Sequence, residues 1–135
     1  MRIVLVTNCL VQSLSPHSVY YAVWESLLNG QNVLCVTTDI LYEYAEILPR
    51  FFSKELAEVI VSTIANAPFV VHVSPTYRFN LIQSDPDDNK FVDCAIIAAA
   101  RYIVTNDHHF NILREITFPL VQIISIKDFV RLISQ

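Results

Sequence analysis

Five short apolar runs alternate with longer segments of helical pattern, and this alternation limits the fold more than any other feature of the chain. The runs are rich in β-branched residues, which is typical of strands buried on both faces of a sheet. We expect these strands at residues 2–6, 32–36, 69–73, 102–104 and 120–125. Strands that alternate with helices predict a parallel sheet sandwiched between helices.

The segments between the strands carry helix signals. Pro16 near a start and Gly30 just past an end bracket one expected helix, and Thr37, Thr38 or Asp39 can cap the next. Thr7-Asn8 is expected to be a turn. The expected helices cover 16–29, 40–48, 54–66, 87 or 88 to about 101, 108–114 and 127–133. In 54–66, the apolar side is expected to carry Leu56, Val59, Ile60 and Ile64.

Composition excludes several classes of protein. The chain has 135 residues, so one domain is expected, and 53% hydrophobic against 16% charged residues argues against disorder. Gly30 is the only glycine, so no glycine-rich phosphate loop or dinucleotide fingerprint can exist. No apolar run approaches the roughly 18 residues of a membrane span, and no signal peptide is visible. Three cysteines without paired spacing are expected to be reduced, buried thiols of a cytoplasmic protein.

Acidic and amide side chains follow the predicted strands or begin the helices after them. Asn8, Glu43, Asp88 and Asp107 should therefore gather at the edge where parallel strands end. Carboxylates that gather repel each other unless a cation intervenes, and hard oxygen ligands suit Mg²⁺ or Mn²⁺. The alternative is that Asp88 and Asp107 are helix caps and Glu43 lies on a solvated face.

Four stretches resemble a PIN domain. They are IVLVTN at 3–8, LYEYAEIL around Glu43, DPDDNKFVDCAIIAAARYIVTND at 85–107, and the closing PLVQIISIKDFVRLI. Together they cover essentially the whole chain, and the nearest group is the VapC-like toxins of bacterial toxin–antitoxin pairs. The resemblance implies a three-layer α/β/α sandwich around a parallel sheet, here of four to five strands, and a ribonuclease that depends on Mg²⁺ or Mn²⁺.

The resemblance also implies roles for individual residues. Glu43 matches the family's helix glutamate, Asp88 its helix-opening aspartate, and Asp107 the aspartate of a T-x-D turn. These three would be the catalytic metal ligands. Thr105 supplies the hydroxyl of that turn and Asn8 matches the asparagine that follows the first strand, so both are expected accessory residues.

The chain departs from the family at the end of the first strand. The family pattern is Asp-Thr-Asn, whereas this chain has Val6-Thr7-Asn8. Valine has no oxygen for a hard cation, so metal binding should weaken, and a misplacement of about 1 Å can cost roughly 100-fold in rate. Two functions stay open: a weakened or inactive ribonuclease, and a degenerate PIN module that binds RNA or a protein partner without cleavage.

Other polar residues keep two interpretations. Asp93 is either an outer acid of the cleft or a solvated helix residue, Asp85 and Asp87 are expected in a turn, and Asp39 is expected to cap its helix. His108 and His109 are expected at the cleft rim or surface. The expected phosphate contacts are Arg50, Lys54, Arg78 and Lys90. Aromatic residues are expected to pack rather than stack on bases: Tyr20, Tyr21, Trp24, Phe51 and Phe52.

The expected partners follow from the resemblance and from charge. RNA is the expected substrate, an antitoxin protein the expected regulator, and a homodimer the expected assembly, with no membrane contact. Because the net charge is −4, an RNA strand would need the metal and a few local cations to be accepted.

Overall fold

The five expected strands form one parallel sheet. In the computed structural model, which describes residues 1–135, they are β1 (Arg2–Leu5), β2 (Val33–Val36), β3 (Val70–His72), β4 (Tyr102–Val104) and β5 (Ile123–Ile124). The order is β3-β2-β1-β4-β5, and every neighbouring pair is parallel. Because β1 is central, the residues that follow it lie between those that follow β2 and β4.

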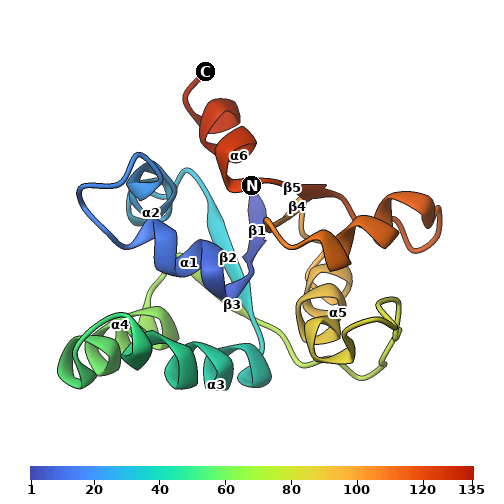
Figure 1. The fold of residues 1–135 in the computed structure, drawn as a ribbon, viewed down its shortest axis with the longest axis horizontal. Coiled ribbons are helices and arrows are strands. Elements are labelled where there is room, and N and C mark those ends of the chain that lie inside the picture. The colour runs from blue at the N-terminus through green and yellow to red at the C-terminus, as the bar shows by residue number, and fades with distance from the viewer.

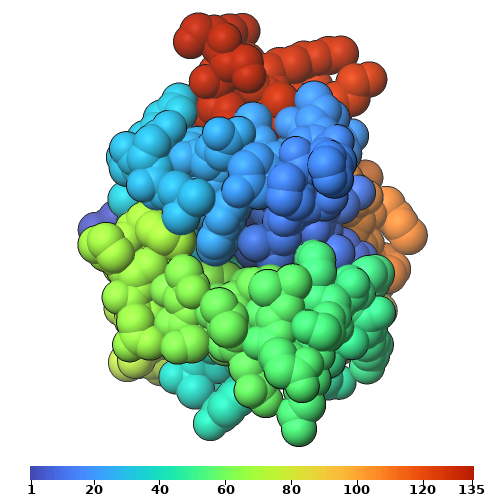
Figure 2. Space-filling view, turned by 90° about the vertical axis from the view of Figure 1, so that its left-hand side faces the viewer, coloured from blue at the N-terminus to red at the C-terminus, as the bar shows by residue number.

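Helices cover both faces of this sheet, which confirms the predicted α/β sandwich. α5 and the segment after β4 lie on one side, and α1 to α4 lie on the other (Figure 1). Figure 2 shows that second side, with α1 and α2 above α3 and α4, and α6 at the top. The α-helices are α1 (Thr7–Ser13), α2 (Tyr21–Leu28), α3 (Thr38–Ile47), α4 (Lys54–Asn66), α5 (Asn89–Ile97) and α6 (Ile126–Ile133). The 3-10 helices are η1 (Leu48–Arg50), η2 (Pro86–Asp88) and η3 (His108–Glu115).

The N-terminal third differs from the prediction. A turn was expected at Thr7-Asn8, but helix α1 begins there, directly after the strand. The carbonyl oxygen of Val6 accepts hydrogen bonds from the backbone N–H groups of Cys9 and Leu10, at 2.9 and 3.1 Å. Burial of both side chains drives this helix, and such a short apolar face gives little sequence signal. The helix expected over 16–29 begins only at Tyr21.

Helix α4 has the predicted bounds but presents another face. Ala57, Ile60 and Ile64 are buried, whereas Leu56 and Val59 are exposed, so those two assignments to the core were wrong. Residues 57, 60 and 64 repeat at helical spacing as well as the predicted set does. Only packing on α3 and β3 decides between the two faces.

The helix that carries Glu43 is fixed to the central strand. Tyr44 is fully buried, and its hydroxyl donates a hydrogen bond of 2.6 Å to the carbonyl oxygen of Leu5. At the start of the helix, the hydroxyl of Thr37 accepts from the backbone N–H of Ile40 at 3.2 Å. Thr37 is therefore the cap, and Asp39 lies exposed in the first turn. These contacts fix the position of α3 relative to the end of β1 and the rotation of α3 about its own axis.

The cysteines and the lengths of the helices were also predicted from the sequence. All three cysteines are free and buried, as predicted. None of the helices combines the length and the apolar character that a bilayer crossing requires.

Candidate metal centre

Acidic side chains from three segments come together beyond the carboxyl ends of β1 and β4. Asp107 follows β4, Asp88 ends η2 just before α5, and Glu43 lies in the middle of α3. The negative charges of Asp107 and Glu43 both raise the pKa of Asp88, so the three carboxylates share one electrostatic environment. Asp88 and Asp107 lie 3.9 and 3.2 Å from the same nitrogen of His109. Glu43, 64 residues before Asp107, acts on Asp88 through its charge but has no donor atom in the close groups around His109.

Asp88 is the most perturbed acid of this group. Burial is the largest cause that raises the pKa of its carboxyl to about 7, and the charges of Asp85, Asp107 and Glu43 raise it further, whereas His109 lowers it. Although Asp88 occupies the N-cap position of α5, its side chain makes no capping hydrogen bond. Its Oδ2 is buried and has no hydrogen-bond partner at all. Asp88 therefore occupies the cap position that one interpretation gave it, but its carboxylate does not cap the helix.

Asp107 caps a helix and also faces the acidic group. Its Oδ1 accepts from the backbone N–H of His109 at 2.9 Å, which starts η3. Its own backbone N–H donates to the hydroxyl of Thr105 at 3.0 Å, and Thr105 is buried. The Thr-x-Asp turn is therefore held from both sides, which limits the rotation of the Asp107 carboxylate.

Both oxygens of Glu43 have partners. The hydroxyl of Thr7 donates to Oε2, and the ammonium group of Lys90 lies 2.8 Å from Oε1. Lys90 also lies 3.2 Å from Asp87, and its side chain is largely buried. Lys90 was expected to contact phosphate, but here it neutralises Glu43. Thr7 was missed because a hydroxyl at a strand end resembles any turn residue.

His109, expected at the cleft rim or surface, lies against the acids. Its Nδ1 lies 3.2 Å from Asp107, 3.7 Å from Asp85 and 3.9 Å from Asp88, and it is buried without a hydrogen bond. The neighbouring His108 is 83% exposed at its side chain. The two adjacent histidines therefore differ: His109 lies against the acids, and His108 is mostly exposed. The position of His109 two residues after the T-x-D aspartate was the available signal.

The end of β1 carries no acid. Val6 is 9% exposed and packs into the hydrophobic core, while its neighbour Asn8 is exposed in the first turn of α1 and makes no side-chain hydrogen bond. Valine cannot offer an oxygen here, so the donors of this centre come from α3, η2, η3 and the loop before η2.

Asp93 does not join this group. It is 6% exposed, so it is not the solvated residue of one interpretation, and its Oδ1 accepts from the backbone N–H of Phe79 at 3.1 Å. It lines a neighbouring polar cavity of about 210 Å³ that Asp39, Arg78 and Lys90 also line. Lys90 separates the two regions, because it contacts Glu43 on one side and lines the cavity on the other.

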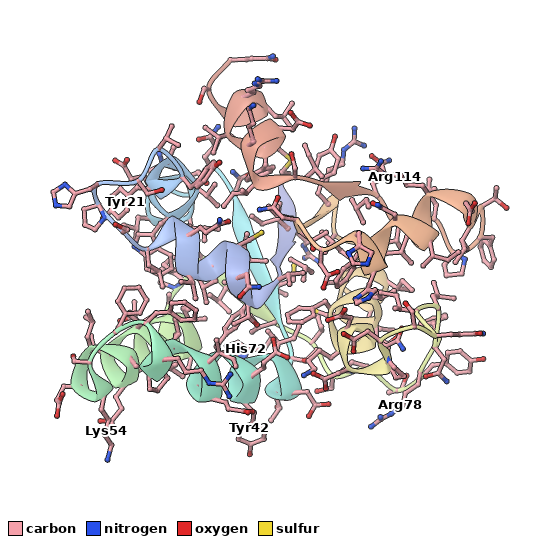
Figure 3. All side chains as sticks on the ribbon, viewed as in Figure 1. Tyr21, Tyr42, Lys54, His72, Arg78 and Arg114 are labelled. Carbon is pink, nitrogen blue, oxygen red and sulfur yellow. The ribbon has the colours of Figure 1, made fainter.

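The other expected phosphate contacts are unevenly placed. Arg78 lies beside α5 on the loop after β3, whereas Lys54 projects from the far end of the α3–α4 layer (Figure 3). Arg50 forms an exposed pair with Glu46 at 3.6 Å. Only Arg78 of these three lines the polar cavity beside the acids. Trp24 is buried against Phe69 with ring centres 5.7 Å apart, and three more of the aromatic residues expected to pack lie partly buried against the core: Tyr20, Tyr21 and Phe52. Phe51 is exposed and does not pack in this chain.

The residues present fit a divalent cation. Two buried polar atoms, Asp88 Oδ2 and His109 Nδ1, face this group of acids without hydrogen bonds. An unsatisfied buried carboxylate oxygen among like charges is costly, and a cation would relieve both the repulsion and the missing contact. One donor set is Asp85, Asp88 and His109, and a second is Asp107, His108 and His109, each with donor atoms within 4.8 Å of one another.

Comparisons with known proteins agree with this architecture. The family model described as PIN domain matches residues 2–109. A solved structure, VapBC2 from Rickettsia felis bound to a DNA fragment from their promoter, superposes with a TM-score of 0.63 and 17% sequence identity. The match covers 93% of this chain and 98% of that chain, and at this identity it shows the fold. A search of curated proteins found no match.

Proposed function

Because the chain belongs to the PIN domain family, we propose that it is a divalent-metal-dependent ribonuclease and the toxin of a toxin–antitoxin pair. The observation that carries this proposal is the convergence of Asp88, Asp107 and Glu43 beyond the carboxyl ends of the central strands, with a buried and unpartnered Asp88 Oδ2. PIN proteins are nucleases as a family, and an acidic group at this edge is where such chemistry requires it.

Asp88, Asp107 and Glu43 would hold Mg²⁺ or Mn²⁺. When bound there, such an ion lowers the pKa of water and stabilises the negative charge that develops on a phosphodiester during hydrolysis. Thr105 and the backbone of η3 orient Asp107, and Thr7 orients Glu43. Lys90 reduces the charge repulsion between Glu43 and an approaching phosphate.

The polar cavity beside the acids supports an RNA substrate. Arg78 and Lys90 line it together with Asp39, Asp87 and Asp93, so a strand whose scissile phosphate lies at Asp88 would meet two cations there, of which Lys90 is already paired with Glu43 and Asp87. The acids and these two cations lie around the same helix, α5, and its preceding turn. A protein with a net charge of −4 needs such a local arrangement to accept a polyanion.

A protein partner is part of the proposal. The structurally similar chain comes from VapBC2 bound to promoter DNA, which supports an antitoxin as the partner of this chain. We propose that the antitoxin binds a homodimer of this chain in the cytoplasm.

The second candidate function is a degenerate PIN module that binds RNA or a protein without cutting. Two observations favour it: the buried Val6 at the end of β1, and the occupation of both Glu43 oxygens by Thr7 and Lys90. In that case the Lys90 ammonium would permanently occupy the position where a catalytic cation interacts with Glu43.

Cleavage of short RNAs in Mn²⁺ tests the two candidates. Four proteins are compared: the chain itself, Val6→Asp, Asp88→Asn and, as a matched control, Asp128→Asn on exposed α6. For a weakened ribonuclease, we expect measurable cleavage, a loss of about 100-fold in Asp88→Asn, a gain of up to about 100-fold in Val6→Asp, and no change in Asp128→Asn.

Two results would change the conclusion. Activity confined to Val6→Asp would support the degenerate module. Equal activity in Val6→Asp and the unmodified chain would refute the explanation that rests on the lost carboxylate.

A further inference from the structure

The Nδ1 atom of His109 belongs to both groups of possible donor atoms in this centre. One group combines it with Asp85 and Asp88, and the other combines it with Asp107 and His108. His109 is therefore the point at which the carboxylates from the η2 turn and from the T-x-D turn meet. No other side chain is shared by the two groups.

The surroundings of this nitrogen are unusual. It is buried, it makes no hydrogen bond, and three carboxylates lie 3.2–3.9 Å away. If the nitrogen is unprotonated, its lone pair faces negative charges. If it is protonated, its N–H makes no hydrogen bond. Buried N–H groups normally have an acceptor, so this state is also unsatisfied. Neither state satisfies the atom within the protein alone.

A divalent cation bound by both His109 Nδ1 and the neighbouring carboxylates would give this nitrogen the partner that it lacks. Ligand atoms around an octahedral ion with bonds of about 2.1 Å lie about 3.0 Å apart when adjacent and about 4.2 Å apart when opposite. The separations of His109 Nδ1 from Asp85 and Asp88, 3.7 and 3.9 Å, fall between these values. Only small side-chain movements are needed for the three atoms to reach one ion.

The missing acid at the end of β1 leaves the ion with one ligand fewer, and this nitrogen can supply a ligand. Val6 contributes no donor, so the centre has fewer carboxylates than the family pattern. An imidazole is a softer donor than a carboxylate and favours borderline ions such as Mn²⁺ or Zn²⁺ over Mg²⁺, compared with an all-oxygen site. A centre with an imidazole nitrogen in place of a carboxylate oxygen therefore prefers different ions.

We propose that His109, through Nδ1, and Asp85 are further ligands of the divalent ion held at Asp88, and that this nitrogen makes the centre prefer Mn²⁺ or Zn²⁺ to Mg²⁺. The inference rests on the proposed metal-dependent function, and it assigns ligands that the family pattern does not. Asp85, expected in a turn, becomes a ligand from the loop before η2. His108, whose side chain is exposed, is not required.

Mn²⁺ binding followed by two methods tests this assignment. Calorimetry on the metal-free full chain measures affinity for Mn²⁺ and for Mg²⁺, and pulsed electron paramagnetic resonance on the Mn²⁺-loaded protein detects a directly bound ¹⁴N nucleus. The variants are His109→Gln and Asp85→Asn, and His108→Gln is the matched control. Circular dichroism establishes that each variant is folded.

We expect ¹⁴N coupling in the unmodified chain and in His108→Gln, and none in His109→Gln. The Mn²⁺ affinity should fall about 10–100-fold in His109→Gln and in Asp85→Asn, while the Mg²⁺ affinity changes less in His109→Gln. Mn²⁺ bound without ¹⁴N coupling in the unmodified chain, or coupling that survives in His109→Gln, would overturn the assignment and leave the ribonuclease proposal standing. Absence of any Mn²⁺ binding would overturn both.

Discussion

The ammonium group of Lys90 lies 2.8 Å from Oε1 of Glu43, and both side chains are more than four-fifths buried. The hydrogen bonds to Glu43 and to Asp87 raise the pKa of Lys90 against the opposing effect of burial. A positive charge thus sits permanently between the acidic centre and the neighbouring polar cavity. Lys90 therefore interacts electrostatically with both the acidic centre and the polar cavity.

Removal of that charge should destabilise the metal-free protein. Lys90→Gln leaves Glu43 without its ion-pair partner, and we expect a loss of about 1–3 kcal/mol in the free energy of unfolding, measured by urea denaturation in the presence of a chelator. Added Mn²⁺ should recover more stability in Lys90→Gln than in the unmodified chain, because a cation can replace the ammonium group. Lys127→Gln, at an exposed position of α6, is the control and should behave like the unmodified chain. A Mn²⁺ effect of equal size in all three proteins would contradict the linkage.

The pKa of Asp88 predicts how stability varies with pH. In the folded chain it is raised to about 7 from 3.8, so the folded state holds a proton that the unfolded state has already lost between these two values. Stability contributed by this group therefore declines as pH rises from about 4 to about 7, and stays low above that range. In chelator, Asp88→Asn should raise the melting temperature at pH 8 and leave it nearly unchanged at pH 4. Asp128→Asn should show no such difference, and a stabilisation by Asp88→Asn of equal size at both pH values would refute the assignment.

An acid at position 6 should harm the metal-free fold and help the metal-bound one. Val6→Asp places a carboxylate in a buried position near the existing acids, and we expect a loss of about 2–4 kcal/mol in the free energy of unfolding in chelator. Mn²⁺ should restore most of this loss. Val6→Asn has a similar shape without the charge, so it should gain much less from Mn²⁺. Equal recovery in the two variants would indicate that position 6 does not face the ion.

The hydroxyl of Tyr44 should be necessary for stability and for the placement of α3. Tyr44→Phe leaves the carbonyl oxygen of Leu5 buried without its partner, which costs about 1–2 kcal/mol. Tyr42→Phe is a close control, because that side chain lies on the same helix but is exposed. Urea denaturation of both variants measures the difference. A Tyr44→Phe protein as stable as Tyr42→Phe would show that α3 is held by other contacts.

The cysteines should be chemically inert in the folded chain. Burial raises the pKa of Cys9 and of Cys94 to about 12, and burial also raises that of Cys35, so little thiolate exists at neutral pH. A thiol reagent such as dithionitrobenzoate should label none of them within minutes at pH 8, and all three after unfolding in urea. Rapid labelling of one thiol without denaturant would show that the core opens locally.

The alternation of apolar runs with helical segments was enough to predict the parallel sheet and the approximate bounds of its strands. These features depend on local patterns, since a strand buried on both faces must be apolar and parallel strands require a crossing segment between them. Helix α4 shows the limit of such patterns. Its bounds were right, but two periodic apolar sets compete along it, and only contacts with α3 and β3 choose the buried one.

The contacts around the candidate centre that the sequence did not predict join residues far apart in the chain. Lys90 reaches Glu43 across 47 positions, and Thr7 reaches it across 36. The only local signal that separates His109, which lies against Asp85 and Asp88, from the exposed His108 is its position two residues after Asp107. The polar atoms that become partners are decided by how the helices pack on the sheet and by which side of each helix faces its neighbours. Both are properties of the three-dimensional structure. The sequence by itself determined the type of sheet and the acids at its edge, and the tertiary structure decided which side chains surround each acid.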